Sequence, residues 1–342
     1  MGKLKKVIWV LQGARAGDNA QARELAGLLD AEIVLKDLQF NSLHLLPNFV
    51  LGASKSTLAT SSKDALLAPW PDMVIGTGKR AAPIARWIKQ QSKGAVKIVH
   101  LGRPRAKLST FDLVIATPQY GLPRDANVVE RALPFATPKI VDAKELEKWR
   151  STWSAMARPL IAVAIGNGKY PLKFGNAQAL LLASQLTDLA KQTGGSLVIM
   201  ASPRTDFALM SLAVDGVQAP NMSYRKFDRA HNPYQSALTL CDRFVVTSDS
   251  ISMISEMINT GKPVNVFELP IAKLKPRWSA SHGLGAWLSR NGILQPPRDV
   301  AGMVRELINR SAVTILGSEA RKPLIKPNES EILVRLNQLL WN

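Results

Sequence analysis

Short apolar runs that end in glycine or hydroxyl turns recur along this chain, and a helical pattern follows most of them. The run at 160–165 ends in Gly166-Asn167-Gly168, and the run at 73–75 ends at Gly76. Continuous apolar runs are typical of parallel strands that are buried on both faces. The repeated order of strand, turn and helix therefore predicts α/β architecture, with parallel sheets wrapped by helices.

The pattern runs through the chain twice. Strands are expected at 6–10, 33–35, 72–76, 97–100, 111–116, 160–165, 197–200, 243–247 and 264–267. A polar stretch at 137–158, with a charged helix over 143–153, separates the two halves and is typical of a domain junction. We predict a first Rossmann-like domain at 1–150, a second at 151–325, and a helix within 326–342 that crosses back to the first.

The chain is strongly basic, with 44 Lys and Arg against 26 Asp and Glu and a formal net charge of +18. Residues 73–111 hold nine basic side chains and no acidic one. Such stretches attract phosphate-bearing surfaces such as anionic lipids, although a solvated face explains them too. No RNA- or DNA-binding motif accompanies the charge, so nucleic acid is not an expected partner.

The N-terminal stretch, the cysteine and the histidines bear on cellular location and metal binding. The apolar stretch at 7–11 is shorter than the roughly 7–15 residues of a signal-peptide core, and we expect a cytoplasmic protein that can lie against the inner face of a membrane. One cysteine excludes an internal disulfide. The four histidines are far apart in sequence, so a zinc cluster is not expected. No other cofactor is predicted.

Candidate binding residues follow the strands of the second half, because ligands of doubly wound sheets lie at the carboxyl ends of strands. Glycine turns and helix starts there offer N–H groups to a phosphate, and an arginine adds a bidentate contact. Tight turns and helix caps are the structural alternatives. The candidates for a diphosphate are Gly166, Asn167, Gly168, Ser202, Arg204, Thr247, Ser248, Asp249 and Ser250.

The segment 245–264 is the most informative. A strand ends in polar residues, and a helix then carries Ser252 and Glu256 on one face. A carboxylate one turn into this helix is placed to accept two ribose hydroxyls. Alternatively, Ser248 or Asp249 caps the helix and Glu256 is merely solvated.

This segment resembles the nucleotide-sugar motif of glycosyltransferases with the GT-B fold. The whole chain is similar to the mitochondrial-fission (elongated mitochondria) family of glycosyltransferases. Pro203 stands where that family usually has a first arginine, and the turn at 117–120 lacks an acidic residue or histidine. The matching pieces are 17–21, 76–80, 111–114, 127–128, 165–168, 201–205 and 247–264.

The resemblance implies a GT-B-like fold in which two domains face a cleft. It places a nucleotide-sugar donor in the second domain and an acceptor in the first, with no metal. Asp18 is then the candidate base, its alternative being a helix cap. Candidate acceptor-binding residues are Gly17, Asn19, Gln21, Lys79 and Arg80.

Two main hypotheses follow. In the first, the protein transfers a sugar from a nucleotide sugar to a cell-envelope glycolipid or saccharide, since bacterial members of the family are associated with lipooligosaccharide core assembly. In the second, it is a membrane-associated scaffold without turnover, as plant members recruit the fission machinery. An epimerase or hydrolase acting on the same donor is a third, weaker alternative.

Overall fold

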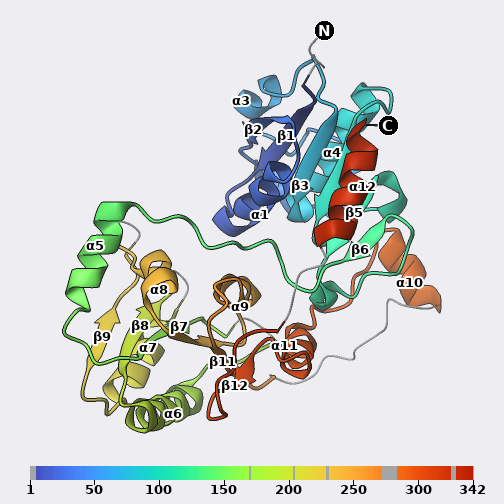
Figure 1. The fold of residues 1–342 in the computed structure, drawn as a ribbon. Coiled ribbons are helices and arrows are strands. Elements are labelled where there is room, and N and C mark those ends of the chain that lie inside the picture. Colours follow the sequence, from blue (N-terminus) through green and yellow to red (C-terminus); the bar gives the residue numbers. More distant parts are fainter. Residues whose placement is uncertain are drawn as a thin grey trace. The chain divides into compact units, whose positions relative to one another are not determined.

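The computed structural model describes residues 5–168, 171–202, 205–228, 231–271, 283–324 and 329–341. The chain divides into two compact units, each built on its own sheet (Figure 1). The first unit comprises Met1–Phe135, Pro276–Asp299 and Pro327–Asn342. The second comprises Ala136–Lys275 and Val300–Lys326. Both sheets are parallel, so the predicted α/β class with two Rossmann-like units is confirmed.

The first sheet has the strand order β2-β1-β3-β4-β5-β6. Its strands are β1 (Val7–Gln12), β2 (Glu32–Asp37), β3 (Met73–Thr77), β4 (Lys97–Leu101), β5 (Leu113–Ala116) and β6 (Val128–Glu130). Its helices are α1 (Ala16–Gly27), α2 (Asn48–Leu51), α3 (Thr60–Asp64), α4 (Gly78–Gln91), α10 (Gly283–Arg290) and α12 (Glu329–Trp341), with short 3-10 turns η1 (Ser42–Leu45), η2 (Leu108–Thr110) and η3 (Pro118–Tyr120).

Both faces of this sheet are buried. Ile8 and Val10 of β1 belong to a core that includes α1 and α12, whereas Trp9 and Leu11 belong to a second core that includes α4. Because successive side chains of a strand point to opposite faces, a continuous apolar run fits only a strand that is covered on both sides.

The second sheet has the order β12-β11-β10-β7-β8-β9. Its strands are β7 (Leu160–Ile165), β8 (Ser196–Ala201), β9 (Met222–Arg225), β10 (Arg243–Thr247), β11 (Val264–Phe267) and β12 (Thr314–Ile315). Its helices are α5 (Ala143–Thr152), α6 (Asn176–Thr193), α7 (Phe207–Asp215), α8 (Tyr234–Leu240), α9 (Ile251–Ile258) and α11 (Val300–Asn309). Helices α6 and α7 pack on one face around Ile161, Val163 and Leu197.

The chain returns to the first unit at its end, as the sequence predicted. Helix α12 packs Ile332, Leu336 and Leu340 into the core around β1 and β3. Its first residue, Glu329, accepts a hydrogen bond of 2.7 Å from the buried Arg131. The final helix is thus part of the first unit's core.

Three strands were missed by the sequence analysis. Strands β6, β9 and β12 have two to four residues each, and β9 is Met-Ser-Tyr-Arg with exposed ends. None has an apolar run, because edge strands need little burial. Among the described helices, none is long and apolar enough to cross a membrane.

Replacing a core residue of α12 tests its role in the first unit. Leu336 is fully buried. We expect Leu336→Ala to lower the free energy of unfolding by about 2–5 kcal/mol, through lost burial and a residual cavity. The exposed Val334 of the same helix is the matched control, and Val334→Ala should change stability by less than about 0.5 kcal/mol. Urea denaturation of both variants measures the difference, and equal losses would contradict the packing.

His100 is a second unusual core residue. It lies in β4 opposite Gly76 of β3 and is completely buried. Its ring is 5.2 Å from that of Phe111, and within the described part of the chain neither ring nitrogen has a hydrogen-bond partner. Burial lowers the pKa of His100 to about 3 from the ordinary 6.5. The folded protein therefore holds this imidazole neutral.

This burial makes stability depend on pH. Below about pH 6.5 the unfolded chain takes up a proton at His100 that the folded chain refuses, so the free energy of unfolding falls with decreasing pH, by up to about 1.4 kcal/mol per unit. His100→Leu should remove this part of the acid sensitivity and cost little at neutral pH, because no hydrogen bond is lost. Denaturation curves from neutral to mildly acidic pH test this, with the exposed His231→Gln as control. An unchanged slope in His100→Leu would refute it.

Candidate functional site

Two strand ends meet at the point where the chain reverses direction across the second sheet. The chain passes from β7 outward to β8 and β9, and then returns to place β10 on the other side of β7. Nucleotides bind doubly wound sheets at this switch point, beyond the carboxyl ends of the two strands. Here the switch point brings Gly166–Gly168, which follow β7, beside Ser248–Ser250, which follow β10.

The carboxylate of Asp249 joins these two turns. Its Oδ2 accepts hydrogen bonds from the backbone N–H groups of Asn167 (3.1 Å) and Gly168 (3.2 Å). The hydroxyl of Thr247 donates to Asp249 Oδ1 at 2.7 Å and accepts from Gly166 N–H at 2.8 Å. The three amides that the sequence analysis offered to a phosphate are thus bonded within the protein. Asp249 does not cap α9, so the structural alternative given for this residue is wrong.

Both glycines are required by this close contact. A Cβ on Gly166 would lie 2.3 Å from Asp249 Oδ1. Gly168 has φ +58°, and a Cβ there would lie 2.3 Å from the backbone nitrogen of Phe174. A side chain at either position would therefore separate the turn from its partners.

A third turn, after β8, is tied to the same edge. The Thr205 hydroxyl donates to Ile165 O at 2.7 Å and accepts from Ser202 N–H at 2.8 Å. Asn167 Oδ1 accepts from the N–H of Asp206, whose carboxylate caps α7. Thr205 and Asp206 were not among the predicted site residues. Arg204, the predicted diphosphate contact, lies outside the described residues.

Helix α9 begins at this edge without a side-chain cap. Ser250 is its N-cap residue, and its hydroxyl makes no capping bond. Ser248 is buried instead, and its hydroxyl accepts from Leu269 N–H at 3.0 Å. Ser248 therefore does not cap α9, and that alternative is wrong as well. The first N–H groups of α9 carry the positive end of the helix dipole.

Glu256 is half-buried and held by a tyrosine. The Tyr234 hydroxyl, at the start of α8, donates to Glu256 Oε2 at 2.6 Å. Burial and the neighbouring Glu256 carboxylate raise the pKa of Tyr234 well above its usual 10, so it remains a donor. The alternative of a merely solvated Glu256 is wrong. Ser252, one turn earlier on α9, is exposed.

In the first unit, the predicted acceptor residues flank a second switch point, where β1 lies between β2 and β3. Asn19 holds the loop after β1, because its amide exchanges hydrogen bonds of 2.8 and 2.7 Å with Gly13 N–H and O. Asp18 does not cap α1, whose N-cap is Arg15. Its Oδ2 lies 3.5 Å from where a Cβ on Gly78 would be, which places it at the start of α4.

Gly17 and Gln21 lie in α1, exposed and half-buried respectively. Lys79 and Arg80 lie in the first turn of α4. Lys79 Nζ donates to Leu45 O at 2.9 Å, and Arg80 Nη2 donates to His44 Nε2 at 2.8 Å. Burial, and then the charges of Arg105 and Arg80, lower the pKa of Lys79. Cations are therefore concentrated beside the candidate base.

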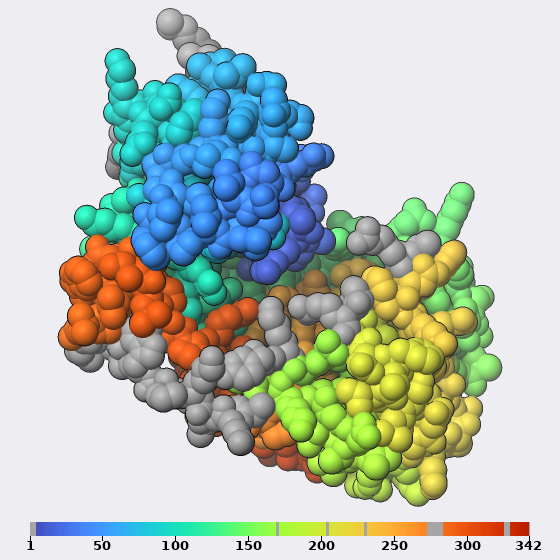
Figure 2. Space-filling view, turned by 180° about the vertical axis from the view of Figure 1, so that it is seen from behind, coloured from blue at the N-terminus to red at the C-terminus, as the bar shows by residue number. Residues whose placement is uncertain are grey.

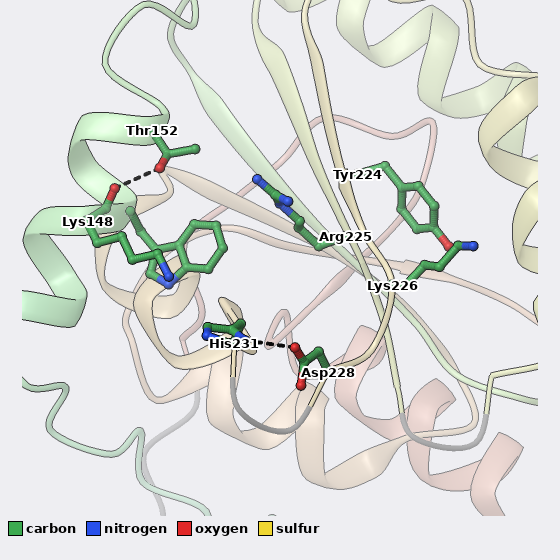
Figure 3. A pocket seen from close by; sticks show the side chains of 8 residues that line it. Lys148, Thr152, Tyr224, Arg225, Lys226, Asp228 and His231 are labelled. Atoms are coloured by element: carbon green, nitrogen blue, oxygen red, sulfur yellow. Dashed lines mark hydrogen bonds and ion pairs between the residues drawn. The ribbon is translucent and has the colours of Figure 1, made fainter.

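A pocket of about 710 Å³ lies elsewhere, between α5 and the edge strand β9 (Figure 3). Arg225 extends toward the Trp149 ring, 5.7 Å from its centre, and His231 Nδ1 lies 2.8 Å from Asp228 Oδ2. None of the predicted site residues lines this pocket. We place the candidate site at the switch point, because three strand-end turns and the start of α9 converge there.

Comparison with protein families identifies the chain. The family model described as Mitochondrial fission ELM1 matches residues 16–298. The chain belongs to the mitochondrial fission ELM1 family. The chain is 27% identical over 303 residues to the uncharacterized protein RP120 of Rickettsia prowazekii, covering 77% of this chain and 83% of that protein. It is 30% identical over 222 residues to the mitochondrial fission protein ELM1 of Arabidopsis thaliana, covering 57% of this chain and 51% of that one.

The fold of this ELM1-family chain is similar to that of a solved glycosyltransferase. It matches the crystal structure of a glycosyltransferase from Rickettsia africae with a TM-score of 0.50 and 13% identity, over 99% of both chains. This likeness concerns the fold alone. The predicted GT-B class is thereby confirmed.

The Asp249 contacts of this ELM1-family site can be tested with glycine variants. Gly166→Ala should lower the free energy of unfolding by about 1–3 kcal/mol, because the new methyl group displaces the carboxylate from two amides. Gly17→Ala is the matched control, since nothing lies within 4 Å of its Cβ position. It should be neutral or stabilising by up to about 1 kcal/mol, as alanine favours a helix. Chemical denaturation compares them, and similar values would contradict the clash.

Proposed function

We propose that the protein is a glycosyltransferase that takes its sugar from a nucleotide sugar bound at the carboxyl edge of the second sheet. The observation that carries this is the uncapped start of α9 at the switch point, with Glu256 one turn further on and fixed by Tyr234. A diphosphate at the first amides of α9 would place the ribose hydroxyls near a rigid acceptor. Helix dipole and backbone donors would then stabilise the leaving diphosphate without a metal.

The glycine turn has a supporting role in this proposal. Asp249 already uses its amides, so Gly166, Asn167 and Gly168 shape the edge, and the diphosphate lies against Ser250 and α9. Thr247 joins the turn after β10 to Gly166, and Ser248 bonds Leu269 N–H, just after β11. Ser202 is bonded to Thr205 within the turn after β8. Ser252 is exposed next to Glu256 and available to the sugar or ribose.

The acceptor is assigned to the first unit. Asp18 lies beside the first turn of α4 and takes the proton from the acceptor hydroxyl. Gly17 and Gln21 lie on α1 with Asp18, while Asn19 fixes the loop after β1. Lys79 and Arg80 suit an anionic acceptor, such as a phosphorylated cell-envelope glycolipid or saccharide of the lipooligosaccharide core type. We place the protein in the cytoplasm, at the inner face of the membrane.

A second candidate function is a scaffold of the mitochondrial-fission type that has kept the fold without turnover. Two observations favour it: the family match, and the occupation of the glycine-turn amides by Asp249. A scaffold has no need of free donors at a switch point. Nucleotide binding separates the two candidates.

Nucleotides should stabilise the folded protein if the first candidate holds. UDP, GDP, ADP and CMP are screened by thermal unfolding. The one that matches the donor should raise the free energy of unfolding by about 2.7 kcal/mol at roughly 100 times its Kd. Glu256→Gln keeps a side chain that Tyr234 can bond, but weakens acceptance of ribose hydroxyls, and should lose most of that shift.

Glu306→Gln on α11 is the control for loss of a charge, since its carboxylate pairs only with the exposed Arg310 among described residues. It should retain the full nucleotide shift. The absence of a shift with every nucleotide, in a protein that is folded by circular dichroism, would reject the transferase in favour of the scaffold.

A further inference from the structure

One segment of the first unit exposes several large apolar side chains. The apolar segment, residues 42–51, comprises η1, a short connection and α2. Leu45 is 72% exposed and Phe49 is 55% exposed. The other exposed apolar side chains of the segment are Leu43, Leu46 and Val50. So many within ten residues is unusual, because soluble proteins rarely expose large contiguous apolar patches.

Cations lie beside this segment, and two of them are hydrogen-bonded to it. Lys79 Nζ bonds Leu45 O, and Arg80 bonds His44 while its guanidinium lies 5.7 Å from the Phe40 ring. Arg105 is close enough for its charge to lower the pKa of Lys79. No ion pair joins Lys79, Arg80 or Arg105 to a carboxylate anywhere in the described ranges. The Asp18 carboxylate of α1 lies close to the start of α4, since its Oδ2 is 3.5 Å from where a Cβ on Gly78 would be.

A buried asparagine builds this arrangement. Asn48 Nδ2 donates to Lys79 O and to Pro104 O, each at 2.8 Å. Hydrogen bonds from Asn48 therefore hold the apolar segment against the first turn of α4 and the loop after β4. Arg105 follows Pro104 with φ +52°, a conformation that residues other than glycine rarely adopt. The position of this charge is set by the fold.

Helix α10 attaches to the same loop from another part of the chain. Gly292, just after α10, packs so closely on Ala106 that a Cβ would lie 2.5 Å from its Cα. Leu284 and Trp287 of α10 are exposed, one turn apart, whereas Ala286 and Ser289 are buried. Figure 2 shows the region around residue 50 in mid-blue and α10 in orange on the same face.

We propose that the apolar segment and the exposed side of α10 insert into the surface of an anionic lipid bilayer, with Lys79, Arg80 and Arg105 bound to its phosphates. Apolar side chains beside lysines and arginines are the chemistry of interfacial membrane binding, and a tryptophan such as Trp287 suits the headgroup level. The inference rests on the proposed function only in that a lipid-borne acceptor would then be within reach of Asp18.

Charge complementarity selects the bilayer over a second copy of the chain. The surface is cationic and lies on a chain of net charge +18. Two such faces would bring like charges together, which opposes self-association. An anionic membrane neutralises them and covers the leucines at once.

Vesicle flotation tests the proposal with the full-length chain. The protein should float with phosphatidylcholine vesicles that contain phosphatidylglycerol, and much less with phosphatidylcholine alone. Leu45→Ser/Phe49→Ser should weaken partitioning roughly tenfold or more, because two inserted apolar side chains are lost. Leu180→Ser/Leu181→Ser on α6 is the matched control, since both leucines are 52% exposed on the second unit. It should float like the wild type.

A second matched pair tests the charges. Arg105→Asn should weaken flotation about fivefold, the effect of one basic residue at an anionic surface. Lys93→Asn removes the same charge at the far end of α4, at a similar φ of +54°, and should change little. Asparagine tolerates this backbone conformation, so both variants should fold.

The other outcomes overturn the proposal. They are the absence of flotation, equal losses in test and control variants, and binding that ignores phosphatidylglycerol. A dimer in light scattering that Leu45→Ser/Phe49→Ser converts to monomer would assign the surface to a second copy. Glu256→Gln should float normally, so failure of nucleotide binding and failure of membrane binding are separately visible.

Discussion

The hydrogen bonds of the Asp249 carboxylate hold the turns of the second unit together at the proposed binding edge of its sheet. They join the ends of β7 and β10, two strands that are neighbours in the sheet but about 80 residues apart in sequence. The parallel pairing of these strands is what brings the turns together, and the carboxylate holds them there. Charge-assisted bonds of this kind are stronger than neutral ones, so the edge is rigid before any ligand arrives.

The repeated apolar runs were enough to predict every strand except β6, β9 and β12, because the inner strands of each sheet are covered on both faces and burial leaves a plain signature. Strands β6, β9 and β12 escaped because a short edge strand needs only one paired neighbour and little apolar surface. The final helix was recognisable from its pattern. Its return to the first unit was predicted as well, but not the contacts that hold it there, which are the core packing of Leu336 and the Arg131–Glu329 ion pair.

The candidate site was predicted less completely than the fold. The turns themselves were found, since glycine and hydroxyl residues mark strand ends. What each side chain does there was not found: Asp249 faces a turn of another strand, and Tyr234 reaches Glu256 from another helix. Such contacts depend on tertiary geometry. Capping rules offered helix caps as the structural alternative for Asp18, Ser248 and Asp249. None of the three caps a helix, because Asp18 lies inside α1 and the other two bond residues distant in sequence.

The bonded glycine turn constrains how a donor can be held. A diphosphate at Gly166–Gly168 would have to replace a carboxylate that already accepts two N–H groups and a hydroxyl, and that carboxylate would then need new partners. The start of α9 requires no such exchange, because its cap position supplies no side-chain bond. Glu256 lies on this same helix, so phosphate and ribose contacts come from one rigid element. The geometry therefore favours α9, and the glycine turn serves as its support.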